Sequence, residues 1–199
     1  GRLPIKKENF KSDCFSAGMG LDSELIVICP VKGDDKKSRV LAVYVSQDYG
    51  KTWNLRGQLP AELALQGYAP AGSVTIADGG YTSEDGISGE LEEGAGKARL
   101  CCFLQAPVDI SNFEQTGPSV MCWSGDRGKS WEAASTVEDN SRGISAVFTK
   151  GGPWNNNWFA AVETSFSTRG TDLYESYNGG LHWRNELTIT NKSAGTGNL

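Results

Sequence analysis

An eight-residue pattern occurs three times in the chain, as SQDYGKTW at residues 46–53, SGDRGKSW at 124–131 and SYNGGLHW at 176–183. All three copies begin with serine, carry an aspartate or asparagine third and a glycine fifth, and end in tryptophan. A short acidic or amide side chain accepts hydrogen bonds from backbone N–H groups two residues on, and glycine supplies the positive φ that closes a turn. Each copy therefore predicts a tight loop, with its indole folded underneath.

The seventh position holds a hydroxyl residue in the first two copies, which can join the turn. The third copy has Asn178 and His182 instead of an acidic and a hydroxyl residue, so we expect a looser turn and interpret His182 as a loop residue. The residues expected to build the loops are Ser46, Asp48, Gly50, Trp53, Ser124, Asp126, Gly128, Trp131, Ser176, Asn178, Gly180 and Trp183.

Runs typical of β-strands precede each loop, namely RVLAVYVS, PSVMCWS and TDLYESY. Two earlier strand candidates precede each of these runs, and one short run follows each tryptophan. Four antiparallel strands with a recurrent turn are typical of a β-propeller blade. We predict an all-β fold of about three blades, at 1–62, 63–140 and 141–190, with an acidic insertion at 79–97 and a flexible tail at 191–199. Propellers have about four to eight blades, so three do not close a ring.

The pattern Ser-x-Asp-x-Gly-x-Thr-Trp resembles the Asp-box (BNR) repeat of sialidases and their relatives. The resemblance implies half of a six-bladed, sialidase-like propeller, with each box between the third and fourth strands of a blade. It implies little about function, because the box lies away from the active site and also occurs in non-catalytic receptors and adhesins. Residues 25–53, LIVICPVKGDDKKSRVLAVYVSQDYGKTW, are also similar to blades of the cysteine-rich protective antigen of malaria parasites, a non-catalytic propeller of an invasion complex.

The resemblance to sialidases also says what an active site would need: three arginines for the substrate carboxylate, a tyrosine nucleophile activated by glutamate, and an aspartic acid. GRLP at the start of the chain resembles the family's Phe/Tyr-Arg-Ile-Pro signature and offers Arg2. Arg169 opens the strand before the third loop, and Glu163 precedes it. The alternatives are a terminal residue for Arg2 and an exposed strand-end charge for Arg169. Half a ring cannot assemble a complete site by itself.

The composition of the chain argues against two classes of partner, nucleic acids and membranes. The net charge of -5 and the pI near 5.0 argue against nucleic-acid binding, which needs a positive face. The longest apolar run is far shorter than the roughly 20 residues of a membrane span. No motif predicts a cofactor or a metal site, and we interpret the acidic insertion as a solvated loop. The sequon that begins at Asn191 predicts glycosylation there and favours a secretory route.

The five cysteines suggest disulfides. Cys14 and Cys29 fall on adjacent predicted strands, and Cys122 follows the strand that carries Cys101 and Cys102. Consecutive strand residues point to opposite faces, so only one of those two can face Cys122. We expect Cys14 to pair with Cys29, and either Cys101 or Cys102 to pair with Cys122. The remaining thiol would be available for a bond to another chain.

These observations predict a non-catalytic segment, secreted or at a cell surface, that binds protein partners in host-cell attachment or invasion. Its two terminal blade faces would be covered by the rest of a cleaved parent chain, by a second copy of this chain or by a different protein that completes the ring. The leftover cysteine and the need to close the ring favour the first. The alternatives are an exo-sialidase or related glycoside hydrolase completed by another chain, and a glycan-binding module that presents Trp154 and Trp158.

Overall fold

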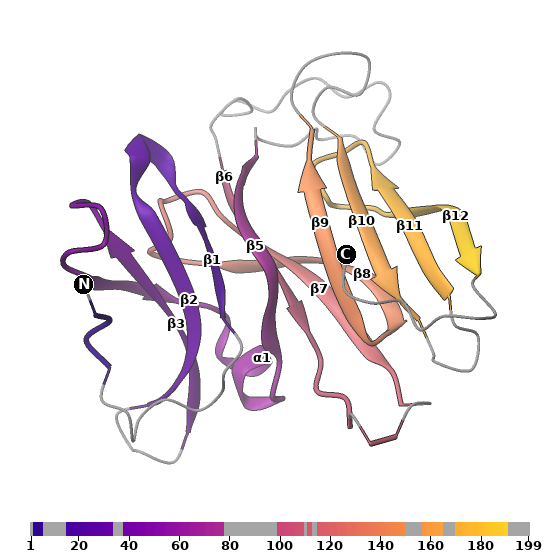
Figure 1. Ribbon diagram of the computed structural model, residues 1–199, viewed down its shortest axis with the longest axis horizontal. Coiled ribbons are helices and arrows are strands. Elements are labelled where there is room, and N and C mark those ends of the chain that lie inside the picture. The colour runs from indigo at the N-terminus through magenta and orange to yellow at the C-terminus, as the bar shows by residue number, and fades with distance from the viewer. Residues whose placement is uncertain are drawn as a thin grey trace.

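The computed structural model describes residues 2–5, 15–33, 38–77, 99–109, 111–112, 115–149, 157–164 and 170–190. These residues form three four-stranded antiparallel sheets placed side by side (Figure 1). The strands are β1 (Ser16–Met19), β2 (Leu25–Lys32), β3 (Arg39–Ser46), β4 (Asn54–Gln58), β5 (Ala69–Ala77), β6 (Arg99–Gln105), β7 (Gly117–Ser124), β8 (Glu132–Ser141), β9 (Gly143–Phe148), β10 (Trp158–Glu163), β11 (Gly170–Ser176) and β12 (Arg184–Thr190). A 3-10 turn, η2 (Leu21–Ser23), and a short helix, α1 (Ala61–Leu65), complete the described elements.

The predicted all-β fold of about three blades is confirmed. Blade 1 has the strand order β1-β2-β3-β4, blade 2 has β5-β6-β7-β8, and in blade 3 the order β9 to β12 is again that of the chain. Each of the three repeated loops joins the third strand of its blade to the fourth. The predicted insertion at 79–97 and the tail at 191–199 lie outside the described residues.

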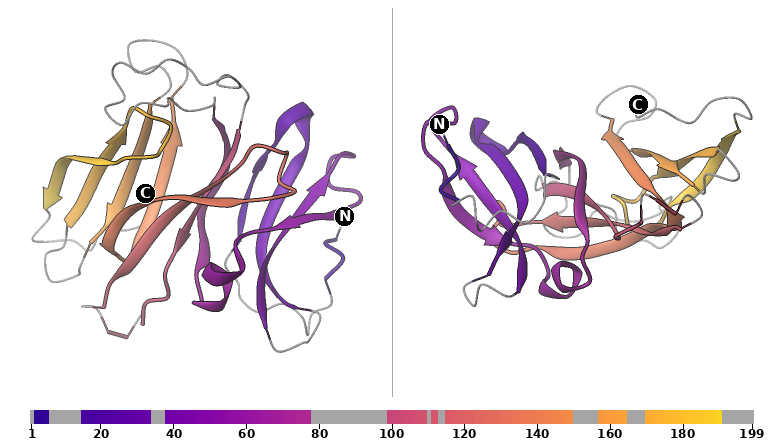
Figure 2. Two further views of the ribbon diagram at one scale, coloured as in Figure 1. Left: turned by 180° about the vertical axis from the view of Figure 1, so that it is seen from behind. Right: turned by 60° about the horizontal axis from the view of Figure 1, so that its bottom comes forward.

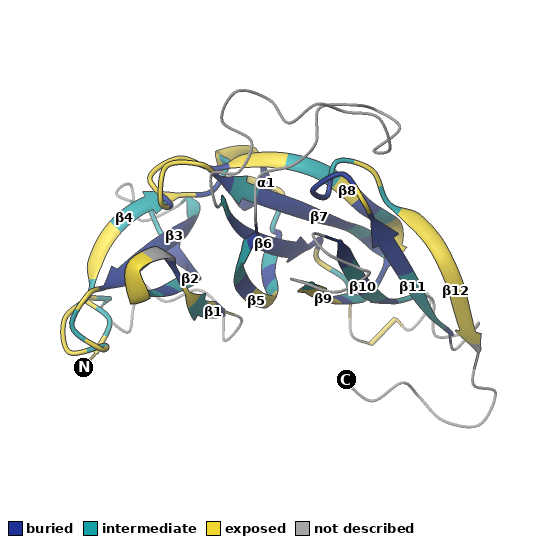
Figure 3. Cartoon of the chain, turned by 90° about the horizontal axis from the view of Figure 1, so that it is seen from above, coloured by how far each residue is buried: buried dark blue, intermediate teal, exposed yellow. Residues whose placement is uncertain are grey.

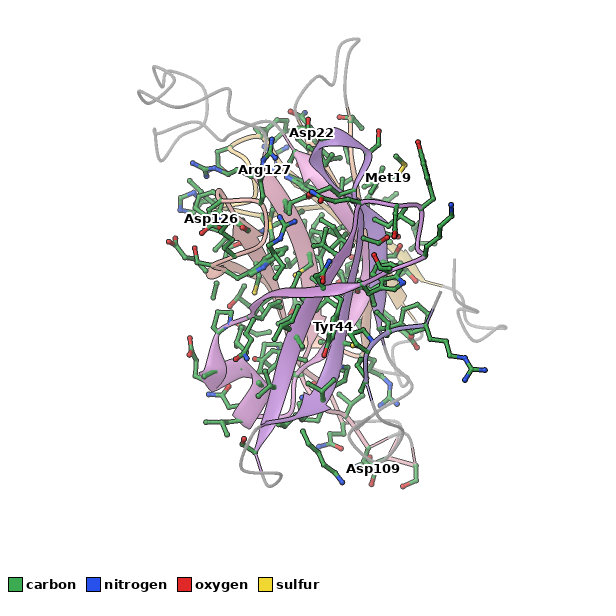
Figure 4. The ribbon with its side chains drawn as sticks, turned by 90° about the vertical axis from the view of Figure 1, so that its left-hand side faces the viewer. Met19, Asp22, Tyr44, Asp109, Asp126 and Arg127 are labelled. Atoms are coloured by element: carbon green, nitrogen blue, oxygen red, sulfur yellow. The ribbon has the colours of Figure 1, made fainter. Side chains whose placement is uncertain are left out.

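The three blades form an arc (Figure 2), in which β1 contacts β5 and β5 contacts β9. These inner strands line the concave side, while β4, β8 and β12 form the more exposed convex side (Figure 3). Along the direction of the strands, the molecule has two ends. We call the end that carries the three repeated loops the box end, and the opposite end, which carries α1, the far end. Figure 4 shows the two ends, with Asp126 and Arg127 near one and Asp109 near the other.

The core lies between the blades, because alternate residues of each strand face opposite neighbours. Blades 1 and 2 enclose a cluster that includes Ile28, Val43 and Leu104. Blades 2 and 3 enclose another, in which the rings of Phe103 and Trp158 meet edge to face with centroids 5.4 Å apart. Each blade has two faces. We call the face directed toward the previous blade in the chain the preceding face, and the opposite face the following face.

The two terminal faces differ, although the sequence led us to expect both to be open. On the preceding face of blade 1, Cys29, Ala42 and Tyr44 are buried, and Leu3 and Ile5 of the N-terminal segment pack on this cluster. The chain itself therefore covers one terminal face at least in part. The following face of blade 3 has no such cover among the described residues and is considered below.

A β-bulge follows every repeated loop and was not foreseen from the sequence. The third residue after each tryptophan, Arg56, Ala134 or Glu186, is skipped in the pairing with the third strand. Such bulges increase the local twist of the outer strand. No helix among the described residues is long and apolar enough to cross a membrane.

Candidate functional site

The first repeated loop is closed by its own serine and aspartate. The Ser46 hydroxyl accepts a hydrogen bond from the Gly50 N–H at 2.8 Å and donates one to Asp48 at 2.8 Å. Asp48 accepts from both the backbone N–H of Thr52, at 2.8 Å, and its hydroxyl, at 2.6 Å. The Trp53 indole nitrogen donates to the Gly50 carbonyl at 3.1 Å. Every position singled out in the sequence thus makes a contact within the loop.

The second loop repeats this geometry. Ser124 accepts from the Gly128 N–H at 2.7 Å, Asp126 accepts from the Ser130 hydroxyl at 2.6 Å, and Trp131 donates to the Gly128 carbonyl at 3.1 Å. The fourth position is left-handed in both loops, with φ of 59° at Tyr49 and 65° at Arg127. The sequence did not indicate this second positive φ, since tyrosine and arginine rarely adopt it.

The hydrogen bonds keep both aspartates ionised. The hydroxyl and backbone N–H of Thr52, with Ser46, lower the pKa of Asp48 to about 2. Burial opposes ionisation of Asp126, but hydrogen bonds from Ser130, Ser124 and Lys129 together lower its pKa to about 2 as well. These carboxylates are committed to the loops, which makes them poor proton donors at ordinary pH.

The third loop keeps the arrangement with different side chains. Asn178 accepts from the backbone N–H of His182 at 3.0 Å, and its amide nitrogen lies 2.7 Å from Nδ1 of the His182 ring. The Trp183 indole donates to the Gly180 carbonyl at 3.1 Å. His182 is therefore a loop residue, as its place in the repeat indicated. Of the three tryptophans, Trp131 is buried, whereas Trp53 and Trp183 are half-buried.

The second and third loops also join neighbouring blades. Gly57 of β4 lies so close to the carbonyls of Gly128 and Lys129 that a Cβ atom there would overlap both. On β8, the Ser135 hydroxyl donates a short hydrogen bond to the Gly180 carbonyl. Gly57 and Ser135 occupy the same position, four residues after the tryptophan of their own blade. The outer strand of one blade therefore rests on the loop of the next.

Charged residues support the first of these joints. Arg127, in the second loop, forms a 2.6 Å ion pair with Asp22 of blade 1, and Figure 4 shows the two side chains together at the box end. Arg56 pairs with the buried Glu24 at 3.0 Å and donates to the Arg127 carbonyl at 3.3 Å. The second and third loops are thus structural joints between blades. They lie at the box end, where the resemblance to sialidases implies no active site.

The cysteine predictions need correction. Cys29, Cys101, Cys102 and Cys122 are all buried free thiols. Of the two neighbouring cysteines, Cys102 lies directly opposite Cys122 in the sheet, but the predicted bridge between them is not formed. Burial raises the pKa of Cys102 well above 9.0 and favours the unreactive protonated thiol.

The thiol that would remain on strand β6 for a bond to another chain is buried. Cys101, the remaining thiol, is only 1% exposed within the core between blades 2 and 3. It cannot reach a second polypeptide in the folded state. Cys14 lies outside the described residues, but Cys29 is a free thiol, so the bridge predicted between them is not formed either.

Of the three candidate catalytic residues, the two that the structure describes lie on different terminal blades. Arg2 is exposed in the segment that covers the preceding face of blade 1. Glu163 is the last residue of β10 in blade 3, two blades away from Arg2, and is half-exposed. Arg169, like Asn191 and Trp154, lies outside the described residues. Trp158 is fully buried in the core, so it cannot present a glycan-binding surface.

Among the described residues, the strands that line the concave side carry none of the charged groups that sialidase chemistry requires. The inner strands β1, β5 and β9 have the sequences SAGM, APAGSVTIA and GISAVF, which contain no ionisable residue. Their exposed side chains are small or apolar, such as those of Met19 and Val147. No group of three or more acidic, histidine or cysteine side chains among the described residues could hold a metal ion.

Two arginines at the far end are already engaged by backbone carbonyls. The guanidinium of Arg142 donates to the carbonyls of Asn112 and Gln115, both at 2.8 Å. That of Arg39 donates a short hydrogen bond to the Tyr68 carbonyl. These arginines fix the connections between strands and do not extend into an open site.

Two tyrosine–glutamate pairs, which the sequence alone could not reveal, resemble part of the sialidase nucleophile. Tyr174 of β11 donates a short hydrogen bond to Glu138 of β8, and Tyr177 donates to Glu175 at 2.6 Å. Burial first, and then the bond to Glu138, raise the pKa of Tyr174, while the bond to Glu175 raises that of Tyr177 to about 12. Tyr174 is buried between blades, and Tyr177 belongs to the third loop at the box end. Neither pair borders the concave side.

A small hollow of about 150 Å³ lies beside the second loop, lined by Arg99, Trp123, Ser124, Gly125, Ser130 and Glu132. The Arg99 guanidinium stacks 3.8 Å above the Trp123 ring, whose indole nitrogen donates to Glu132 at 3.3 Å. Ligand sites usually have volumes of about 300–1,000 Å³, so this hollow is small for one. The Trp123 ring, which could otherwise stack on a ligand, is already covered by Arg99.

No protein-family model matches the chain, and no curated protein matches it by sequence. Solved structures do resemble it. The α-L-arabinanase of Penicillium chrysogenum, solved with arabinobiose, superposes with a TM-score of 0.61 at 11% identity, over 96% of this chain and 52% of that one. The NanB sialidase of Streptococcus pneumoniae gives 0.50 at 11% identity, over 96% of this chain and 46% of that one.

A third similar structure, the Hadza microbial sialidase Hz136, gives a TM-score of 0.51 at 15% identity, over 87% of this chain and 29% of that one. The chain therefore has the fold of propeller sialidases and an arabinanase. It spans about half the length of the arabinanase and less than half that of each sialidase. At these identities the likeness shows the fold alone. No sequence match supports the more specific resemblance to the malaria antigen.

Proposed function

We propose that the chain is a non-catalytic Asp-box propeller segment that binds protein partners at a cell surface. The observation that carries this proposal is that the inner strands, which line the concave side of all three blades, have no ionisable residue. The conspicuous acidic residues, Asp48 and Asp126, instead hold the loops at the box end.

The setting of this binding is host-cell attachment or invasion. This part of the proposal rests only on the resemblance, in the order of strand, polar loop and box, of residues 25–53 to blades of the cysteine-rich protective antigen of malaria parasites. Secretion and glycosylation at Asn191 belong to the same proposal. A second polypeptide covers the terminal face of blade 3, which the described residues leave open.

Hydrolysis assays test the absence of catalysis. Fluorogenic sialosides and arabinofuranosides would be incubated with the purified chain and with any polypeptide that co-purifies with it. We expect no turnover above a buffer control. Turnover that is lost in a Glu163→Gln variant would overturn the proposal.

The alternative is a sialidase or related glycoside hydrolase whose site another chain completes. It is favoured by the likeness to an arabinanase and two sialidases and by Glu163, which is half-exposed on the following face of blade 3. Activity seen only with the second polypeptide would support this alternative. Binding to sialylated or arabinose-containing glycans on an array, without hydrolysis, would instead support a glycan-binding module.

A further inference from the structure

The hollow of about 150 Å³ beside the second loop is built by the middle blade alone. Arg99 is the first residue of β6, Trp123 lies in β7, and Glu132 is the first residue of β8. The second loop supplies the rest of the lining. Neither terminal face of the arc therefore contributes to this hollow.

The corresponding place in blade 1 is occupied by side chains of its own blade. In blades 1 and 2, a charged residue precedes the leucine that pairs with the loop serine, namely Glu24 in blade 1 and Arg99 in blade 2. Glu24 is only 2% exposed, and its Oε1 accepts hydrogen bonds from Gln47 at 2.7 Å and Arg56 at 3.0 Å. The charge at this position in blade 1 is thus met by two long polar side chains.

Blade 2 has neither of these long side chains. Gly125 holds the second position of the loop, where blade 1 has Gln47, and Ala134 holds the third position after the tryptophan, where blade 1 has Arg56. A Cβ atom at Gly125 would meet no other atom within 4 Å, and Gly125 lines the hollow. The hollow is therefore open where blade 1 is filled.

The guanidinium of Arg99 is held flat but keeps its hydrogen-bond donors. It stacks 3.8 Å above the ring of Trp123, and the indole nitrogen of that ring donates to Glu132 at 3.3 Å. Among the residues that the structure describes, the guanidinium has no hydrogen bond or ion pair. Its N–H donors lie in the plane of the group, so stacking leaves them available. Arg99 is thus an oriented donor at a hollow that lacks an acceptor for it.

The chemistry of the hollow favours a carboxylate as the missing acceptor. A carboxylate accepts two parallel hydrogen bonds from a guanidinium. The carboxylates of Asp126 and Glu132 lie beside or in the lining, so a phosphate, with its larger negative charge, would be repelled more strongly. The volume suits one functional group and is small for a complete ligand. The carboxylate is therefore best supplied by a side chain of a larger partner.

We propose that this hollow binds an aspartate or glutamate side chain of a protein partner, whose carboxylate forms a bidentate pair with Arg99. Tryptophan and arginine are the residues most enriched where binding energy is concentrated in protein interfaces, and a guanidinium that is already oriented loses less entropy on binding. The net charge of -5 gives no long-range attraction for an acidic partner, so recognition depends on this local pair. The proposal names a partner chemistry for the proposed protein binding and rests on the proposed function to that extent.

Titration of the ¹⁵N-labelled chain with hexaglutamate tests the proposal, and hexaglutamine is the neutral control peptide. The readout is the indole N–H resonance of Trp123, which is assigned with a Trp123→Phe variant. We expect a saturable shift with hexaglutamate and none with hexaglutamine. Acetate at the same carboxylate concentration should give a much smaller shift, because it lacks the rest of a peptide.

Variants connect the binding to the hollow. Arg99→Gln should weaken hexaglutamate binding at least about tenfold, since it removes a charge-assisted pair. Arg99→Lys should also weaken it, because lysine lacks the planar fork. Gly125→Gln places a side chain where blade 1 has one and should abolish binding, whereas Gly125→Ala should bind as the parent does. The matched charge control is Lys129→Gln, which removes an exposed positive charge from the same loop and should leave the affinity unchanged.

Circular dichroism checks that each variant is folded, and Gly125→Gln decides alone if Arg99→Gln is not. Equal affinity of the parent, Arg99→Gln and Gly125→Gln proteins would overturn the proposal, as would the absence of any saturable shift. Saturation by acetate as strong as that by hexaglutamate would assign the hollow to free carboxylates and overturn the choice of a protein side chain. A peptide that binds while the Trp123 resonance stays unmoved would refute this hollow and leave the proposed protein binding standing.

Discussion

The indole nitrogen of Trp183 donates a hydrogen bond to the Ser135 hydroxyl, 3.0 Å away, and that hydroxyl donates to the Gly180 carbonyl. Ser135 belongs to the outer strand of blade 2, and the other two residues belong to the loop of blade 3. A motif whose sequence suggests only a local turn therefore also joins blades. Between blades 1 and 2 the same position is Gly57, and the joint there depends on close backbone approach.

Gly57→Ala should destabilise the protein by about 1–3 kcal/mol, because the added methyl group would overlap the carbonyls of Gly128 and Lys129 and force blades 1 and 2 apart. Urea unfolding at constant m-value measures this. The matched control is Gly125→Ala, where an added Cβ meets no atom within 4 Å. That variant should stay within about 0.5 kcal/mol of the parent protein. Equal stability of the two variants would refute the joint.

Trp131→Ala should lower the free energy of unfolding by about 3–5 kcal/mol, since it removes a large side chain from the core between blades 1 and 2. The same change at the half-buried Trp53 should cost less, because less contact area is lost. Both values come from denaturant unfolding followed by far-UV circular dichroism. A larger loss at Trp53 would mean that the loop of blade 1 packs against something beyond the described residues.

Much of the fold followed from the sequence because the repeats are local. Asp48 and Asp126 make their bonds within four residues, so spacing alone was enough to predict the loops. Strand alternation likewise predicted that only one of Cys101 and Cys102 could face Cys122, and the register shows that it is Cys102. The count of blades then followed from the number of loops.

What could not be predicted depends on contacts across the blades. Nothing in the sequence separates Gly57 from a glycine that has open space around it, such as Gly125. The pairing of Tyr174 with Glu138 joins residues 36 positions apart. The cover of Leu3 and Ile5 over Tyr44 is likewise a contact between distant segments. The disulfide prediction failed because facing cysteines establish proximity but not oxidation.

The loop aspartates should contribute to acid stability. The pKa of Asp48 and of Asp126 falls from 3.8 to about 2 on folding, so their stabilisation is complete above about pH 4 and is lost as the pH falls toward 2. In the double variant with Asp48→Asn and Asp126→Asn, the urea midpoint should be lower than in the parent at neutral pH. The difference should shrink between pH 4 and 2. Urea titrations at several pH values measure it.

The control for this pH dependence is Glu62→Gln. It removes one exposed carboxylate from α1, at the end of the arc away from the loops. Its urea midpoint should follow that of the parent protein throughout. A double asparagine variant whose midpoint runs parallel to the parent down to pH 2 would show that the loop carboxylates do not couple to folding.

The buried thiols should be inert in the native protein. Burial raises the pKa of Cys29 to about 11 and that of Cys101 to about 12, and thiols react chiefly as thiolates. In a Cys14→Ser background, Ellman's reagent at pH 8 should label none of the four remaining cysteines before unfolding and all four in urea. Rapid labelling of the native protein would show that the blade interfaces open. The opposite result would be that only two of the four cysteines react in urea and that a non-reduced peptide map shows Cys102 joined to Cys122. That result would restore the predicted bridge and strengthen the case for secretion.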